Sequence, residues 1–201
     1  CVNVDKIINR RMDITDDYLW FTLYELIKQG FYDGGQMDPQ CSTFSAVRGL
    51  DGGPEPVRGP QGDELYGLPG LAEDKRLQVK KDTLLAIRVS LIAFEFHVQK
   101  KPFIIKQPAM RDQHPSMFNL REFVKLRSWP GVYLWTFKQC NMKSYSQKPT
   151  TLLCYGVQVK ADAFPNRCPH TPQWFRYSDG GWLWARHPPL RGTRKAVPAQ
   201  S

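Results

Sequence analysis

Short runs of apolar, β-branched and aromatic residues alternate along this chain with longer segments of helical periodicity. Runs of this length favour strands, and apolar residues spaced three and four apart favour helices. We predict strands at 2–4, 31–37, 102–105, 132–137 and 150–156, and helices at 18–30, 77–98 and 114–126. Strands that alternate with helices are typical of α/β domains, so we expect an α/β fold with a mostly parallel sheet.

Two of the predicted helices carry apolar stripes, and such a stripe is typical of a face turned to the core. In the first, Trp20, Leu23, Tyr24 and Ile27 share one face, and Thr-Asp-Asp at 15–17 precedes it as a helix cap. In the second, the stripe consists of Leu84, Ile87, Leu91, Phe94 and Val98. Ser116 is the expected cap of the third helix.

The net charge of +9 is unevenly distributed along the 201 residues. Residues 1–123 hold 16 Lys and Arg against 17 Asp and Glu, a balance of −1, whereas residues 124–201 hold 12 against 2, a balance of +10. A basic half of this kind favours a polyanionic partner, and nucleic acid is the partner we expect. A basic face that aids solubility or docks onto an acidic neighbour is the alternative.

The segment 157–201 has little periodicity and is rich in Pro, Trp and Arg, so we expect an irregular basic extension beside a domain at 1–156. Aromatic residues alternate there with arginines, as in a surface on which bases stack and phosphates pair. A small satellite core of aromatic residues is the other interpretation. The basic residues expected to contact nucleic acid in this segment are Arg176, Arg186, Arg191, Arg194 and Lys195.

The five cysteines are far apart in the sequence, and none forms a C-x-x-C pair. This usage indicates an intracellular, reducing compartment, with nucleus and organelle left open. Cys168 and His170, taken with Cys154 and His187, do not match the spacing of standard zinc sites, so no metal is expected. The most apolar run, 83–96, is too short for a membrane span and contains two charges.

Cys41 follows the predicted strand at 31–37, and three small hydroxyl-bearing residues follow it in the run CSTFS. A disulfide partner, a buried packing thiol and a nucleophile on a loop are the three readings of such a cysteine. Ligands of open α/β sheets bind at the carboxyl ends of the strands, which is where this loop is expected. Asp5 ends another predicted strand at that edge, where a carboxylate can accept a ribose hydroxyl of a nucleotide-like cofactor; an ordinary strand-end cap is the alternative.

Several segments together resemble a known family. VNVD at 2–5 with DIT at 13–15, YDGGQMDPQCSTFSAVRG at 32–49, PFIIKQP at 102–108 and FKQCNMKSYSQKPTTLLCYG at 137–156 resemble, in order, motifs of the S-adenosylmethionine-dependent DNA cytosine-5 methyltransferases. The chain looks like a divergent, N-terminally truncated member. The resemblance implies a Rossmann-like methyltransferase fold that lacks its first strand.

The resemblance also implies roles for individual residues. Cys41 aligns with the nucleophile that attacks cytosine C6, and Lys106 stands where the family has the glutamate that contacts the ring. The implied cofactor-binding residues are Asp5, Asp13, Ile14 and Pro39, and the implied nucleic-acid contacts are Ser42, Arg48 and Lys148. S-adenosylmethionine is the implied cofactor, provided that a glycine-rich loop, which this chain lacks before Asp5, is supplied.

The chain departs from the family pattern at two positions near the thiol. Lys106 reverses the charge of the usual glutamate, and Asp38 places a carboxylate just before Cys41, where the family commonly has Gly-Pro-Pro. We expect a DNA cytosine-5 methyltransferase-like protein that binds DNA or RNA, with catalysis either retained or degraded by these departures. A non-catalytic descendant, kept as a nucleic-acid-binding or structural subunit of a larger assembly, is the alternative.

Overall fold

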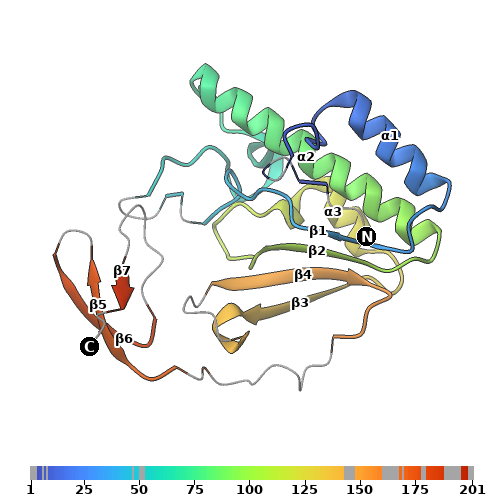
Figure 1. Ribbon diagram of the computed structural model, residues 1–201. Helices are drawn as coiled ribbons and strands as arrows, with labels where there is room; N and C mark the ends of the chain where they lie inside the picture. Colours follow the sequence, from blue (N-terminus) through green and yellow to red (C-terminus); the bar gives the residue numbers. More distant parts are fainter. Residues whose placement is uncertain are drawn as a thin grey trace.

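The computed structural model describes residues 4–5, 7, 9–46, 48–49, 53–142, 148–159, 168, 170–177, 180–187 and 196–198. The chain is mixed α/β, as expected (Figure 1). Its first part contains α1 (Asp17–Lys28), β1 (Gly35–Met37), η1 (Gly62–Tyr66), α2 (Glu73–Val98), β2 (Phe103–Pro108), η2 (Met117–Asn119), α3 (Arg121–Arg127), β3 (Tyr133–Lys138), η3 (Gln139–Met142) and β4 (Pro149–Tyr155). A second, smaller sheet is built from β5 (Gln173–Tyr177), β6 (Trp182–Ala185) and β7 (Ala196–Pro198).

The main sheet has the strand order β1-β2-β4-β3 and is mixed, which corrects the expectation of a mostly parallel sheet. Only β1 and β2 pair in parallel, with Gly35 opposite Phe103, and β4 is antiparallel to both of its neighbours. The chain between β3 and β4, residues 139–148, is too short for the helical crossover that a parallel pair usually needs. The two strands therefore pair as a hairpin, and β4 is inserted between β2 and β3.

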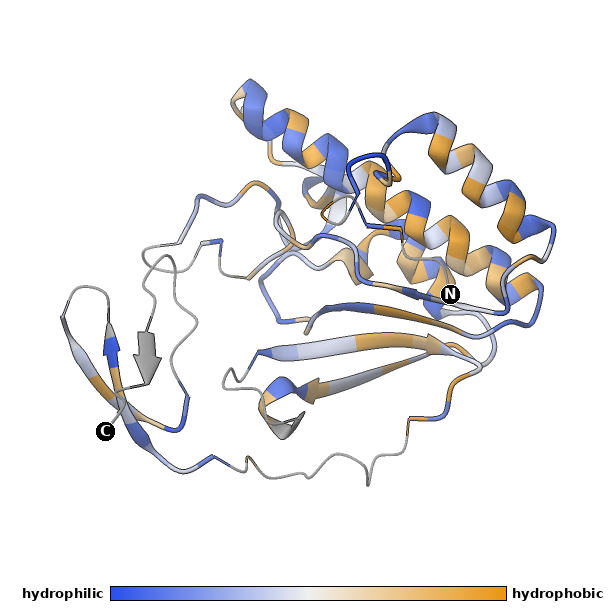
Figure 2. Cartoon of the chain, in the orientation of Figure 1, coloured by the Kyte–Doolittle hydropathy of each residue, from blue (hydrophilic) through white to orange (hydrophobic). Residues whose placement is uncertain are grey.

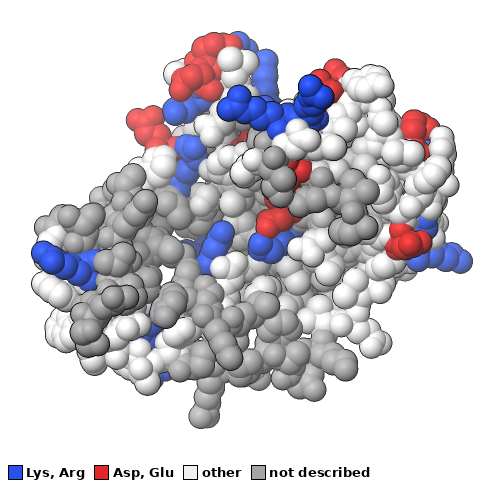
Figure 3. Space-filling view, in the orientation of Figure 1, with Lys and Arg blue, Asp and Glu red and all other residues white. Residues whose placement is uncertain are grey.

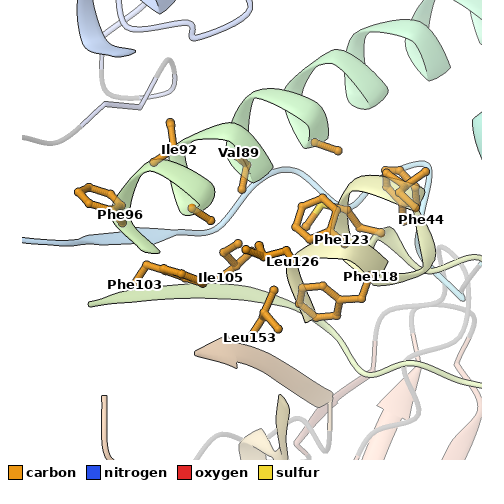
Figure 4. Packing of buried hydrophobic residues seen from close by; sticks show 14 of the residues in the cluster. Phe44, Val89, Ile92, Phe96, Phe103, Ile105, Phe118, Phe123, Leu126 and Leu153 are labelled. Atoms are coloured by element: carbon orange, nitrogen blue, oxygen red, sulfur yellow. The ribbon is translucent and has the colours of Figure 1, made fainter. Parts of the chain in front are cut away.

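The three α-helices lie on one face of this sheet (Figure 1). Side chains from α2 and α3 meet the sheet in a single hydrophobic core, in which Phe123 and Leu126 of α3 pack near Ile105 and Leu153 (Figure 4). Phe103, Ile105, Phe123, Leu126 and Leu153 are all fully or almost fully buried. The core thus holds the sheet against its helical layer, while the loops at the ends of the strands lie outside the core.

The apolar stripe predicted to bury α2 faces largely outwards, which corrects that expectation. Leu84 and Leu91 are each 37% exposed and Val98 is 65% exposed. The helix instead buries a face that carries both small and large side chains, among them Val79, Ala86, Val89, Ala93 and Phe96. Small residues on that face allow close approach to the sheet: a Cβ at Gly35 of β1 would lie 2.6 Å from the Phe96 ring. The first turns of α2 are mostly hydrophilic (Figure 2).

The predicted face of α1 is confirmed. Trp20 and Ile27 are buried, and Leu23 and Tyr24 pack against the core. Asp16 begins the helix because its carboxylate accepts a hydrogen bond from the Leu19 amide at 2.9 Å.

The predicted helix at 114–126 is divided into two elements. Ser116 caps the short η2, and the backbone then turns extended at Leu120, with ψ of 146°, before α3 begins. Of the strand predicted at 2–4, residues 2 and 3 lie outside the described residues, and Val4 and Asp5 belong to no strand. The C-terminal segment expected to be irregular contains the antiparallel sheet β6-β5-β7. No helix within the described ranges is both long and apolar enough to cross a membrane.

Candidate functional site

Three strands of the main sheet share one direction. Because β1 is parallel to β2, and β4 is antiparallel to β2 and to β3, the strands β1, β2 and β3 all run the same way. Their carboxyl ends at Met37, Pro108 and Lys138 therefore lie along one edge, where β4 also begins at Pro149. This is the edge at which open α/β sheets bind their ligands.

Cys41 lies on the loop that leaves this edge, four residues after the end of β1. Its side chain is half-buried and forms no disulfide, so two of the three readings, the disulfide partner and the fully buried thiol, do not hold. A turn closes from the Cys41 carbonyl to the Phe44 amide at 3.0 Å. Phe44 is buried in the core and anchors the loop three residues after Cys41.

Asp82 on α2 holds the loop from the helical layer. Its Oδ2 accepts hydrogen bonds from the Ser42 hydroxyl at 2.8 Å, the Thr43 hydroxyl at 2.8 Å and the Thr43 amide at 3.3 Å. Asp82 and Thr43 are both buried. Bonds from neutral donors to a buried carboxylate are strong, so they fix the residues that follow Cys41.

Arg58, which is 2% exposed, completes this anchor. Its guanidinium donates to the Thr43 hydroxyl at 3.0 Å and to backbone carbonyls of Leu65 and Val79, and it stacks 3.9 Å from the Phe44 ring centre. Burial lowers the pKa of Arg58 to about 10, against the raising influence of Asp82, so the side chain stays cationic at neutral pH. Sequence reasoning missed Arg58 and Asp82, because a single charge inside a loop or a helix has no distinguishing pattern.

Arg48, predicted to contact nucleic acid, is also engaged with the loop. Its Nε donates to the Ser42 carbonyl at 2.7 Å and its Nη1 to the Glu55 carbonyl at 2.9 Å. Two of the five N–H donors of a guanidinium thus serve the backbone. The Ser42 hydroxyl donates its hydrogen bond to Asp82. Both residues stabilise the shape of the loop.

The end of β2 binds the other end of the loop. Lys106 forms an ion pair with Asp38, and the neighbouring Gln107 donates to the Pro39 carbonyl at 2.7 Å. The two residues predicted separately as departures, Lys106 and Asp38, therefore neutralise each other. Gln107 Oε1 is buried and has no hydrogen-bond partner among the described residues. Pro39, an implied cofactor residue, is buried at this junction.

The implied cofactor residues Asp13 and Ile14 are tied to α2. Asp13 Oδ1 accepts a hydrogen bond from the Thr15 amide at 3.0 Å, and its Oδ2 accepts one from Lys81 Nζ at 3.1 Å. The Ile14 carbonyl accepts a hydrogen bond from Arg88 Nη1 at 2.6 Å. Since Lys81 adjoins Asp82, the Asp13 segment and the Cys41 loop are held at consecutive positions of one helix. The recorded bond of the Asp5 carboxylate is local, from the Ile7 amide at 2.8 Å, as in an Asx turn.

The remaining predicted nucleic-acid residues are divided between two places. Lys148 is exposed just before β4, at the same edge as the Cys41 loop. Arg176 and Arg186 are exposed on and after the strands of the small sheet. Arg191, Arg194 and Lys195 lie outside the described residues. Acidic and basic side chains are mixed over α1 and α2 (Figure 3), so the helical layer shows no basic surface on that face.

The small sheet presents tryptophans to solvent. Trp174 of β5 pairs with Trp184 of β6, and Arg176 pairs with Trp182, so these four side chains share one face. Trp174, Trp182 and Trp184 are 53%, 56% and 56% exposed, and Arg176 lies 5.8 Å from the Trp182 ring centre. The satellite-core interpretation therefore holds for Phe175 on the opposite face, which is fully buried, and is wrong for the tryptophans.

A cavity of about 760 Å³ opens between η1 and the segment that follows β2. Its lining includes Gln61, Met110, His114 and Arg127, and none of the predicted catalytic or cofactor residues. The predicted residues therefore gather at the Cys41 loop and not at this cavity. Comparison of the chain with protein-family models, with curated proteins and with solved structures finds no match.

Proposed function

We propose that this protein is a DNA cytosine-5 methyltransferase-like protein that binds nucleic acid and uses Cys41 as its nucleophile. The observation that carries the proposal is the position of Cys41: half-buried, at the carboxyl edge of three co-directional strands, on a loop fixed by Asp82, Arg58 and Gln107. Motif resemblance in four segments supports the same assignment. A nucleophile must be held within about 0.5 Å of its productive position, and the hydrogen bonds around this loop support such a position.

The chemistry requires a thiolate because C5 of cytosine is a poor nucleophile. The Cys41 sulfur bonds to C6 as the C5–C6 π bond opens, which makes C5 an enamine-like carbon. S-adenosylmethionine, when bound, would supply the methyl group that C5 takes; the proton later leaves C5 and the sulfur is eliminated. The target base has to leave the helical stack to reach this loop.

Three side chains and the tryptophan face of the small sheet have proposed roles in that reaction. Lys106 aligns in sequence with the family's ring-contacting acid. Its ammonium can donate a hydrogen bond to the exocyclic carbonyl of cytosine if it gives up its ion pair with Asp38. Asp5 and Asp13 are carboxylates with several lone-pair sites each, so both can accept a ribose hydroxyl in addition to the local bonds they make. The tryptophan face of the small sheet offers stacking surfaces for neighbouring bases.

The test is covalent capture by an oligonucleotide in which 2-pyrimidinone replaces cytosine. That base has an electrophilic C6, so adduct formation needs no methyl transfer: sulfur bonds to C6, and C5 takes a proton from water. We expect a denaturation-resistant adduct that peptide mass spectrometry maps to Cys41. Cys41→Ser should abolish it, whereas Cys154→Ala, which removes another thiol, should retain it. An adduct on a different cysteine, or none, contradicts the nucleophile assignment.

A second candidate function is a non-catalytic nucleic-acid-binding subunit. The Lys106–Asp38 ion pair favours it, because that pair places neither a free acid nor a free cation beside the thiol. Isothermal titration with S-adenosylmethionine distinguishes the two. Binding together with the Cys41 adduct supports the enzyme, whereas nucleic-acid binding without either supports the subunit.

A further inference from the structure

Two cysteines and two histidines from separate segments meet beside the small sheet. Cys140 Sγ, Cys168 Sγ and His187 Nε2 all lie within 4.8 Å of one another. His170 Nδ1 is 3.6 Å from Cys168 Sγ, and the His170 and His187 rings stand edge to face with centroids 4.9 Å apart. Cys140 is fully buried, and the other three are half-buried. None of these residues belongs to the Cys41 site.

The pairing of β5 with β6 explains why these four side chains lie close together. In the antiparallel β5–β6 pair, Gln173 lies opposite Ala185, so the chain before β5 and the chain after β6 emerge at the same end. His170 precedes that pair and His187 follows it. Cys140 comes from η3, directly after β3 of the main sheet. Sequence reasoning grouped Cys154 with these residues instead, because it had no means of pairing β5 with β6.

We propose that Cys140, Cys168, His170 and His187 form a Zn²⁺ site that fastens the β5–β6 hairpin to the end of β3. The proposal is independent of the function proposed above. Two thiolates and two imidazoles are a donor set that structural zinc sites use, and four protein ligands leave no open position for catalysis.

One of two sulfur–nitrogen separations fits tetrahedral coordination as it stands, and His170 would approach the group of Cys140, Cys168 and His187 to become the fourth ligand. Bonds of about 2.3 Å to sulfur and about 2.0–2.1 Å to nitrogen place neighbouring ligand atoms roughly 3.3–3.8 Å apart. The Cys168–His170 separation of 3.6 Å falls in that range. The Cys168 Sγ to His187 Nε2 distance is 2.8 Å, so His187 would move outwards by about 1 Å to admit the ion. Burial, and next to it the Cys168 thiol, raise the pKa of the Cys140 thiol, whereas a cation between the sulfurs would favour both thiolates.

The small sheet has a structural need for such a site. Among its described residues Phe175 is the one that is fully buried, and its tryptophans face solvent. A short antiparallel sheet with so little buried apolar surface is marginal in water, and small modules of this size commonly rely on a metal. A disulfide between Cys140 and Cys168 would leave the two histidines without a role, and neither cysteine is in a disulfide.

The experiment uses the full chain, purified in reducing buffer without added metal. Elemental analysis by plasma mass spectrometry should give about one zinc per chain. After removal by a chelator, Co²⁺ should restore one equivalent with the visible absorption of tetrahedral cobalt and a thiolate-to-metal charge-transfer band. Cys140→Ser, Cys168→Ser and His187→Asn should each lower retained metal at least tenfold. Cys154→Ala and His97→Gln, which change a buried thiol and a histidine elsewhere, should keep it.

Three results would overturn the proposal. The first is substoichiometric zinc combined with no cobalt spectrum in the wild-type chain. The others are iron or copper bound in place of zinc, and a Cys140–Cys168 disulfide in the reduced protein. Metal retained by Cys140→Ser overturns it as well. If the cysteine variants do not fold, the cobalt titration of the wild-type chain decides alone, because charge transfer requires thiolate ligands.

Discussion

The Asp82 carboxylate on α2 accepts a hydrogen bond from the Thr43 hydroxyl at 2.8 Å, across 39 residues of chain. The same oxygen also accepts from Ser42, and the charge stands near the buried Arg58. One carboxylate therefore joins the helical layer, the loop of the candidate nucleophile and the cation that supports that loop.

Removing this charge should destabilise the fold. We expect Asp82→Asn to lower the free energy of unfolding by about 2–4 kcal/mol, because Arg58 would keep its buried charge without a counter-ion. Urea denaturation measures this. Asp33→Asn removes the same charge from an exposed site and should change stability by less than about 0.5 kcal/mol. Equal effects of the two variants would show that the Asp82 contacts contribute nothing specific.

How far the sequence predicts this fold is clear from particular elements. The face of α1 and four strand positions followed from local pattern, because the residues that make them are neighbours in sequence. The buried face of α2 did not, because it combines Ala86 and Ala93 with the charged Asp82 and Arg88, whose burial depends on distant partners. Likewise Cys41 was found at its strand end, whereas Cys140 could be linked to His187 only through tertiary pairing.

The close approach of β1 to α2 should make Gly35 sensitive to substitution. A Cβ there would lie 2.6 Å from the Phe96 ring, and no positive φ adds backbone strain. Gly35→Ala should cost about 1–3 kcal/mol, as other overpacked contacts do. In a Phe96→Leu background the same change should cost at least about 0.5 kcal/mol less, because the ring is gone. Additive costs in this double-mutant cycle, measured by chemical denaturation, would rule out the contact as the cause.

The buried Cys154 thiol should make stability fall in alkali. Burial raises the pKa of Cys154, although its contact with Tyr133 lowers it. A thiol with a raised pKa keeps its proton in the folded state after the unfolded chain has lost it, so stability decreases as pH rises through about 8.5. The loss from this group approaches about 1.4 kcal/mol per pH unit. Cys154→Ala should flatten the profile between pH 8 and 10 by that amount; an unchanged slope would contradict the assignment. Cys140 is present in both proteins, so its contribution to the two profiles cancels.

The tryptophan face should bind single-stranded nucleic acid by stacking. Trp182 is 56% exposed and lies beside Arg176 and Trp174, so its removal takes away a ring without opening a core. We expect Trp182→Ala to weaken oligonucleotide binding by about 5- to 150-fold, because stacking contributes about 1–3 kcal/mol per base, and to leave the melting temperature unchanged. Phe21→Ala, which removes a 62% exposed ring from α1, is the matched control and should bind as the wild type does.

Fluorescence anisotropy at two salt concentrations measures the oligonucleotide affinity of both variants. Equal affinity of all three proteins would remove the small sheet from the nucleic-acid surface, while a loss shared by Trp182→Ala and Phe21→Ala would indicate a general effect on the fold.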